Sequence, residues 1–106
     1  MFNIFRKKKP ENRLPVKNVS LHIYGIDAHN TSVFLYRDEI AGVQQTDNRF
    51  QLLLRHGGYR IMFQARDNNN DYVEQLLERI GNCMSETRPN VTSYSIVVKD
   101  LHIVKE

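Results

Sequence analysis

The segment Arg49–Arg66 constrains the fold of this chain more than any other part of the sequence. Two runs in which apolar and polar residues alternate flank a Gly57-Gly58 dipeptide. Such a glycine pair supplies the positive φ angles of a two-residue type I′ turn, so the segment is predicted to form a β-hairpin. This turn predicts the following pairs on the polar face: Arg49 with Arg66, Gln51 with Gln64, Leu53 with Met62, and Arg55 with Arg60. The opposite, mostly apolar face then packs against a core.

The polar face of this hairpin is the predicted partner-binding site, and it comprises Arg49, Gln51, Leu53, Arg55, Arg60, Met62, Gln64 and Arg66. Like charges that face each other across a strand pair are unfavourable, so two Arg–Arg pairs require a counter-charge or a function. Guanidinium groups bind carboxylates and phosphates through forked donors, and an apolar centre ringed by arginine is typical of a binding surface. The alternative is a solvated face whose arginines pair with nearby Asp or Glu. A one-residue slip in the turn would exchange the two faces.

Short alternating segments predict further strands before the hairpin, at residues 19–24, 31–36 and 40–44, with a turn at 37–39. The period then changes to that of a helix. Asp71 with Glu74 fits a capping box that starts this helix. Its apolar face contains Val73, Leu76, Leu77, Ile80 and Met84, with Cys83 at the margin.

A long strand follows at residues 91–104, and a change in its alternation near Lys99-Asp100 predicts a β-bulge. Together the segments predict an α+β fold with the order βββββαβ. We expect a curved antiparallel β-sheet or partly open barrel of about six strands, with an amphipathic helix at about residues 71–84 on its apolar face. A length of 106 residues suits one domain, placed at residues 16–106 and preceded by a flexible basic arm at residues 1–15.

The positive charge of the chain is concentrated in this N-terminal arm. Residues 1–17 contain six Lys or Arg and one Glu, a formal +5, whereas the remaining residues hold nine basic and eleven acidic side chains, a formal −2. The arm could make weak peripheral membrane contact, track a nucleic-acid backbone, or have no specific role. Its candidate residues are Phe2, Ile4, Phe5, Arg6, Lys7, Lys8 and Lys9.

The remaining polar residues give little support for catalysis or metal binding. Cys83 is the one cysteine in the chain, so an internal disulfide is excluded, which favours a reducing, cytoplasmic location. His22 and His102 would approach each other if the first and last strands pair, but two ligands are fewer than a metal site normally needs. The serines lack a nucleophile motif. We therefore expect a protein that is not an enzyme and that has no metal or cofactor.

The leading functional hypothesis is a small non-enzymatic binding module, an inhibitor, adaptor or accessory protein that recognises an acidic protein surface through the arginine face. A phage or mobile-element accessory role would suit its size. One alternative is a nucleic-acid-binding protein that uses the same face and the arm, although Phe50, Tyr59 and Phe63 are predicted to point away from the arginines. Another is a homodimeric structural or assembly protein with Leu53 and Met62 at its interface.

Overall fold

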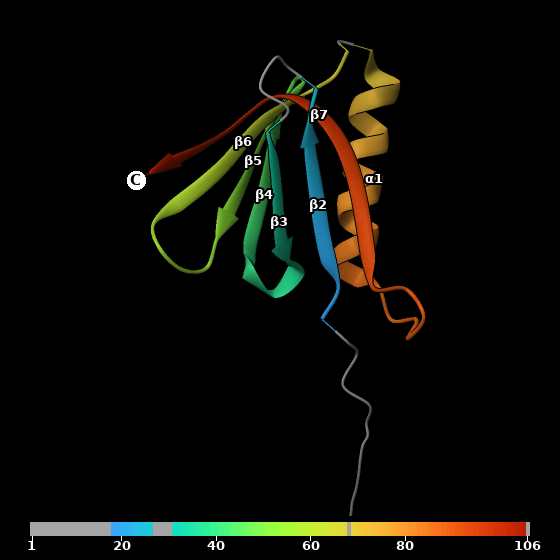
Figure 1. The fold of residues 1–106 in the computed structure, drawn as a ribbon. Helices are drawn as coiled ribbons and strands as arrows, with labels where there is room; N and C mark the ends of the chain where they lie inside the picture. Colours follow the sequence, from blue (N-terminus) through green and yellow to red (C-terminus); the bar gives the residue numbers. More distant parts are fainter. Residues whose placement is uncertain (1–17, 27–30, 68, 106) are drawn as a thin grey trace, which may run out of the picture.

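A computed structural model describes residues 18–26, 31–67 and 69–105 and shows an α+β fold (Figure 1). The elements are β2 (Ser20–Gly25), β3 (Ser32–Tyr36), the 3-10 helix η1 (Arg37–Glu39), β4 (Ile40–Thr46), β5 (Arg49–Leu54), β6 (Tyr59–Ala65), α1 (Asn70–Ser85) and β7 (Ser93–Lys105). The predicted order βββββαβ is confirmed. The seven candidate residues of the arm lie outside the described residues, so the arm stays a prediction.

Among the residues that the structure describes, six strands form one open sheet with the order β3-β2-β7-β6-β5-β4. Four of the five strand pairs are antiparallel, as predicted, but β2 and β7 run parallel, from Ser20 opposite Ser93 to Gly25 opposite Val98. The prediction of a wholly antiparallel sheet is therefore wrong at this pair. Short connections favour antiparallel neighbours, whereas β2 and β7 are joined by most of the chain, so no turn determines their direction.

β7 divides the sheet into two halves. Its first part pairs with β2, and its second part, from Val98 onward, pairs with β6. Within the second part Asp100 has a φ of 54°, and the register with β6 shifts between Met62 and Gln64. This irregularity confirms the predicted bulge. A bulge bends its strand, and in Figure 1 β7 arches from the half that contains β2 and β3 to the half that contains β4, β5 and β6.

The core lies between the sheet and α1, which packs against β2, β6 and β7. Phe50 and Phe63 face each other across the hairpin with ring centroids 5.3 Å apart, and both are fully buried. From the helix the buried side chains are Leu76, Ile80 and Cys83. The predicted apolar face is confirmed at Leu76 and Ile80 but is wrong at Leu77, which is 40% exposed, and at Met84, which is also exposed. The packing turns the Cys83 side of the helix, rather than the Met84 side, to the core.

The N-terminus of α1 is capped by a residue other than the predicted one, and its C-terminus is capped by Arg37 of η1. At the N-terminus the Asn69 side chain accepts a hydrogen bond from the Asp71 backbone N–H, at 2.8 Å, so the capping box predicted from Asp71 and Glu74 is wrong by two residues. At the C-terminus the Arg37 guanidinium donates to the carbonyl oxygens of Cys83 (3.1 Å) and Glu86 (2.6 Å). The last carbonyls of a helix lack partners within the helix and carry partial negative charge. Arg37 therefore ties η1 to the helix.

A network beyond the helix joins Glu86, Arg88 and Tyr94. The Glu86 carboxylate accepts hydrogen bonds from the Arg88 Nε, at 2.8 Å, and from the Tyr94 hydroxyl, and it is buried. Hydrogen bonds from the Arg88 side chain, then from Tyr94, hold the pKa of Glu86 well below its usual 4.5. The same network therefore attaches the start of β7 to the end of α1. Within the described ranges, no helix is long and apolar enough to cross a membrane.

Candidate binding groove

The β5–β6 hairpin pairs in a register two residues away from the predicted one. Arg49 lies opposite Gln64, Gln51 opposite Met62, and Leu53 opposite Arg60. The predicted two-residue turn at Gly57-Gly58 is therefore wrong, because the connection runs from Arg55 to Gly58, with both glycines at positive φ. A shift of two residues preserves the face of every side chain. The Arg–Arg pairs are lost, but the division into an inner and an outer face survives.

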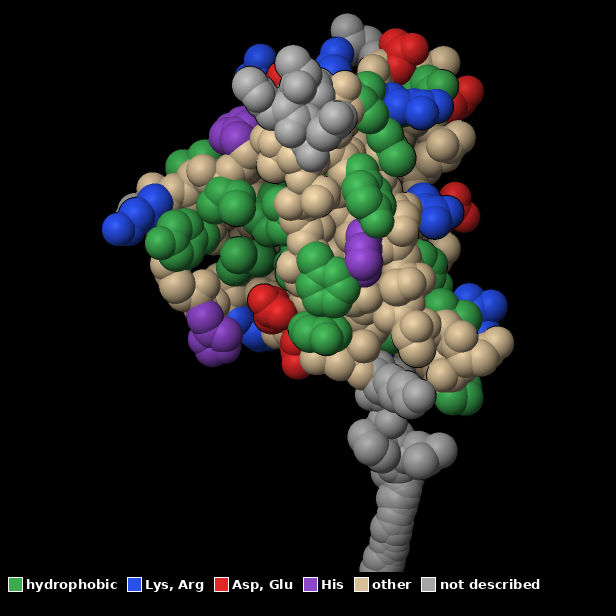
Figure 2. Space-filling model, in the orientation of Figure 1, with side chains coloured by type: hydrophobic (Ala, Val, Ile, Leu, Met, Phe, Trp, Pro, Cys, Tyr) green, Lys and Arg blue, Asp and Glu red, His purple; other side chains and the backbone are tan. Residues whose placement is uncertain are grey.

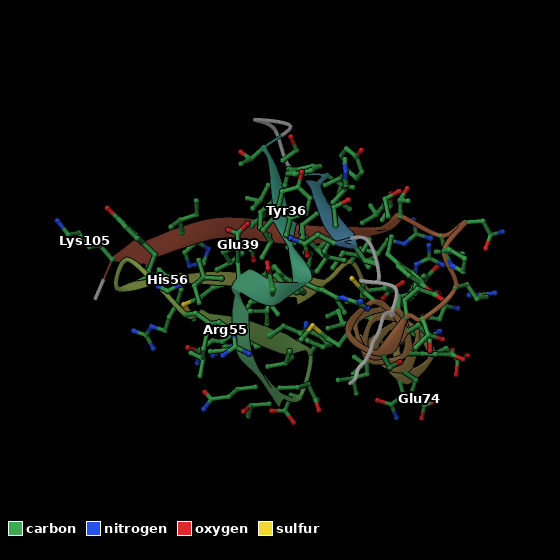
Figure 3. All side chains as sticks on the ribbon, turned by 90° about the horizontal axis from the view of Figure 1, so that it is seen from below. Tyr36, Glu39, Arg55, His56, Glu74 and Lys105 are labelled. Atoms are coloured by element: carbon green, nitrogen blue, oxygen red, sulfur yellow. The ribbon has the colours of Figure 1, made fainter. Side chains whose placement is uncertain are left out.

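The reason for the longer turn lies outside the hairpin. β5 also pairs with β4, where Leu54 faces Ile40, and the Arg55 N–H donates to the Glu39 carbonyl oxygen at 2.9 Å. This bond engages Arg55 with η1, and the chain then departs from β6. Figure 3 shows Glu39 and Arg55 on these neighbouring segments. The hairpin sequence alone does not contain this constraint.

The four arginines of the predicted site have four different environments. Arg49 lies on the outer face of β5, and Arg55 lies in the exposed turn. Arg60 is partly buried, and its guanidinium donates to the Gln51 side-chain oxygen at 2.9 Å. Arg66 lies beyond β6, with its guanidinium 4.7 Å from the centre of the Tyr72 ring and bonded to the Tyr72 hydroxyl at 3.1 Å. Six of the eight predicted residues remain on one sheet face, and Arg55 and Arg66 leave it.

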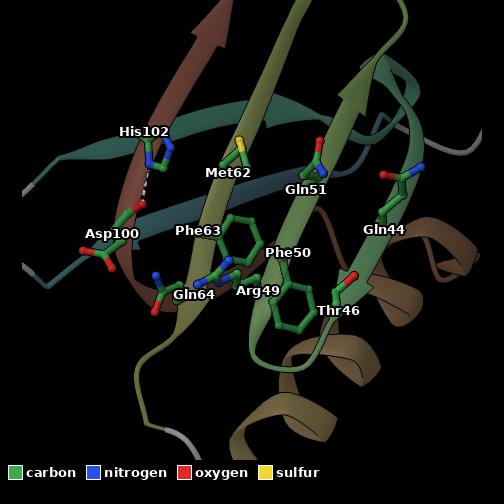
Figure 4. Close-up of a pocket in the computed structure, with 10 residues that line it drawn as sticks. All are labelled: Gln44, Thr46, Arg49, Phe50, Gln51, Met62, Phe63, Gln64, Asp100 and His102. Atoms are coloured by element: carbon green, nitrogen blue, oxygen red, sulfur yellow. Dashed lines mark hydrogen bonds between the residues drawn. The ribbon is translucent and has the colours of Figure 1, made fainter.

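A groove of about 430 Å³ lies on this outer face, opposite the helix (Figure 4). Its lining residues come from four adjacent strands: Gln44 and Thr46 from β4, Arg49, Phe50 and Gln51 from β5, Met62, Phe63 and Gln64 from β6, and Asp100 and His102 from β7. The predicted site supplies Arg49, Gln51, Met62 and Gln64. The hairpin sequence alone did not predict the β4 and β7 residues, because only the pairing of β4 with β5 and of β7 with β6 places them beside the hairpin. The alternation of polar and apolar residues along β4 and β7 is the sequence signal that places them on an outer face.

The groove offers hydrogen-bonding groups, the Arg49 guanidinium and the Asp100 carboxylate around an apolar centre. Three glutamine side chains and Thr46 provide neutral donors and acceptors, Arg49 provides a forked cationic donor, and Met62 contributes apolar surface. His102 uses Nδ1 in a contact of 2.7 Å with the Asp100 carbonyl oxygen, drawn as the dashed line in Figure 4. Such a lining can form hydrogen bonds with an extended polar ligand.

The predicted approach of His22 to His102 is wrong. β2 and β7 do pair, but His22 lies opposite Ser95 in the first half of β7, whereas His102 lies opposite Met62 in the second half. Among the residues that the structure describes, no three His, Cys, Asp or Glu side chains gather in a group that could hold a metal ion.

An exposed aromatic row, which the sequence did not reveal, covers the outer face of the other half. It consists of His22 and Tyr24 on β2 and Phe34 and Tyr36 on β3. The ring centroids of His22 and Phe34 are 4.5 Å apart, and those of Phe34 and Tyr36 are 5.3 Å apart, both edge to face. Figure 2 shows apolar and histidine side chains gathered on this face. Strand alternation alone predicts a polar outer face, so it does not indicate an aromatic row.

Comparison of the chain with protein-family models, curated protein sequences and solved structures finds no match. The function is therefore argued from the groove and the sheet faces.

Proposed function

We propose that this chain is a non-enzymatic binding module whose outer groove recognises an acidic segment of a protein. The observation that carries the proposal is the position of Arg49 beside the glutamine side chains of a groove in which Asp100 supplies the one carboxylate among the described residues. An arginine binds a carboxylate through two parallel hydrogen bonds, and the neighbouring Gln51 and Gln64 provide donors for the peptide backbone.

The charges near the groove support an acidic ligand. Arg60 lies on the same face beside Gln51, and Lys99 lies opposite Gln64 on β7. Asp100 is the acidic residue in the lining. Cationic side chains thus outnumber acidic ones at this face, although residues 18–106 as a whole carry a formal −2. A locally positive surface on a slightly acidic domain favours a local carboxylate contact over extended binding to a phosphate backbone.

This face carries less positive charge than the four-arginine surface predicted from the sequence, so the expected affinity is modest. Arg55 and Arg66 do not contribute to the groove lining. The nucleic-acid and homodimer alternatives through this face have no observation in their favour here: Phe50 and Phe63 stack in the core, and Leu53 and Met62 are already partly buried.

The test uses a defined probe, a fluorescent peptide in which Glu and Leu alternate, with a Lys-Leu peptide and a mixed single-stranded oligonucleotide for comparison. We expect the full chain to bind the acidic peptide, and Arg49→Glu to weaken binding about tenfold or more, because it places a carboxylate against carboxylates. Arg66→Glu is the matched control, since Arg66 contacts Tyr72 away from the groove. Fluorescence anisotropy gives the affinities.

Amide chemical shifts measured by NMR locate the bound peptide. Changes should concentrate at Gln44, Gln51, Gln64 and His102, which line the groove. Equal loss of binding in Arg49→Glu and Arg66→Glu would show nonspecific charge attraction and contradict the groove. Stronger binding of the oligonucleotide than of the acidic peptide would instead favour the nucleic-acid hypothesis.

A further inference from the structure

A second cleft, of about 210 Å³, lies between α1 and the first half of β7. Its lining residues are Arg66 beyond β6, Tyr72, Gln75, Leu76 and Arg79 from α1, and Ser95, Ile96 and Val97 from β7. This α1–β7 cleft shares no residue with the groove on the outer face. Among the described residues its lining holds two arginines and no carboxylate, whereas the lining of the groove contains both Arg49 and Asp100. The α1–β7 cleft is therefore the more positively charged of the two.

The cleft forms where β7 pairs with a strand on one side. Pairing of β7 with β6 begins at Val98, which lies opposite Ala65. Before this point β2 pairs with one side of β7, and α1 packs beside β7 (Figure 1). Within the part of the chain that the structure describes, the first half of β7 therefore presents the other side of its backbone to α1.

The backbone of Ser95 faces this cleft. The Val98 carbonyl oxygen accepts a hydrogen bond from the Ile26 N–H at 2.9 Å, so the backbone of Val98 points toward the β2 side. Backbone groups alternate in direction along a strand, so those of Ser95, three residues earlier, point the other way. The Ser95 carbonyl oxygen accepts a hydrogen bond from Arg79 Nε at 2.8 Å, in agreement with this direction. The Ser95 N–H lies on the same side and provides a backbone donor to the cleft.

Each of the two arginines is oriented by contacts that leave donors for a ligand. The Arg66 guanidinium lies 4.7 Å from the centre of the Tyr72 ring, and one of its terminal nitrogens donates to the Tyr72 hydroxyl at 3.1 Å. Arg79 uses Nε for Ser95, which leaves its two terminal nitrogens available among the described residues. None of the four residues three or four positions from Arg79 on α1 is acidic, so the helix supplies it with no ion pair. Guanidinium groups that are already oriented lose less entropy when they bind an anion.

We propose that the α1–β7 cleft binds a phosphate group, with Arg66 and Arg79 as its two forked donors and the Ser95 N–H as a third. A phosphate monoester carries a charge of about −1.5 to −2 at neutral pH and has three strong acceptor oxygens. These oxygens suit two guanidinium groups that reach the cleft from different elements. A carboxylate has two oxygens in one plane, which a single arginine satisfies. The cleft therefore favours phosphate, either as the free ion or as the monoester of a small molecule.

The test is a titration of the isotope-labelled full chain with inorganic phosphate at constant ionic strength, measured by NMR. The Ser95 amide signal and the Nε–H signals of Arg66 and Arg79 should shift and saturate. Arg66→Gln and Arg79→Gln should each weaken binding about tenfold, because each removes a charge-assisted pair. Arg55→Gln, which removes an arginine from the exposed hairpin turn, is the matched control and should bind like the wild type.

Arg79→Lys separates forked recognition from simple charge attraction. Lysine keeps the positive charge but lacks the planar fork, so this variant should bind phosphate several-fold more weakly than the wild type. Unchanged binding in Arg79→Lys, or an equal loss in Arg55→Gln and Arg79→Gln, would overturn the proposal. So would the absence of a saturable shift at Ser95. Circular dichroism of every variant confirms that the fold is retained.

Two further ligands identify the anion. Acetate at the same ionic strength should bind more weakly than phosphate, and tighter binding of acetate would contradict the choice of phosphate. Glycerol 3-phosphate distinguishes the two sources, since tighter binding than that of inorganic phosphate assigns a monoester, and equal or weaker binding assigns the free ion. Phosphate should leave the affinity of the groove for the acidic peptide unchanged, because the two sites share no residue. The two sites can therefore fail independently.

Discussion

The two halves of the sheet share one core but present opposite chemistry to solvent. The outer face of β4, β5, β6 and the end of β7 carries amides, Arg49 and a groove, whereas that of β2 and β3 carries an exposed aromatic row. The inner faces of both halves are apolar and buried. The core therefore constrains only one side of each strand, and the outer side of each half is available for a different contact.

The largest expected difference between the halves comes from the same substitution made at an inner and an outer phenylalanine. Phe63→Ala removes a fully buried ring that stacks on Phe50 and should lower the free energy of unfolding by about 3–5 kcal/mol. Phe34→Ala removes an exposed ring and should lower it by less than about 1 kcal/mol. Urea denaturation of both variants measures the contrast, and equal losses would mean that Phe34 is buried in solution.

A smaller effect is expected at the junction of the halves, where Asp100 adopts a φ of 54°. Asp100→Val places a β-branched residue in the left-handed region and should destabilise the fold by roughly 1–2 kcal/mol. Asp100→Gly relieves this backbone requirement and is the control. If chemical denaturation finds Asp100→Val as stable as Asp100→Gly, the bulge does not require this conformation.

The smallest predicted effect is a pH dependence that comes from Glu86, where α1 ends and its carboxylate contacts Tyr94 of β7. Because the pKa of Glu86 is lowered on folding, its ionised form contributes stability that is fully present above its usual value of 4.5 and is lost as the pH falls below it. Glu86→Gln should therefore unfold at lower temperature than the wild type near neutral pH, and the gap should narrow at about pH 3. Thermal melts across this range measure it. A gap that does not change with pH would contradict the ionic role of Glu86.

The sequence predicted the features of the hairpin that depend on alternation, and it missed those that depend on neighbours. Gln51 and Met62 lie on the outer face as predicted, because side-chain direction alternates along a strand whatever the partner. The register was wrong by two residues because Arg55 bonds to Glu39 of η1, a contact between segments. In the same way Gln44 and His102 became groove residues only through pairing with β5 and β6.

The sequence by itself determined the order of the elements, the helix near residues 71–84, the bulge near Asp100 and the inner or outer face of each hairpin residue. These are local properties of periodicity and turn chemistry. Only the tertiary structure decided the parallel pairing of β2 with β7, the cap that Arg37 provides for α1, and the position of β3 at one end of the strand order among the described residues. Each of these joins or exposes segments distant in sequence, and their arrangement depends on how the whole core packs rather than on any one segment.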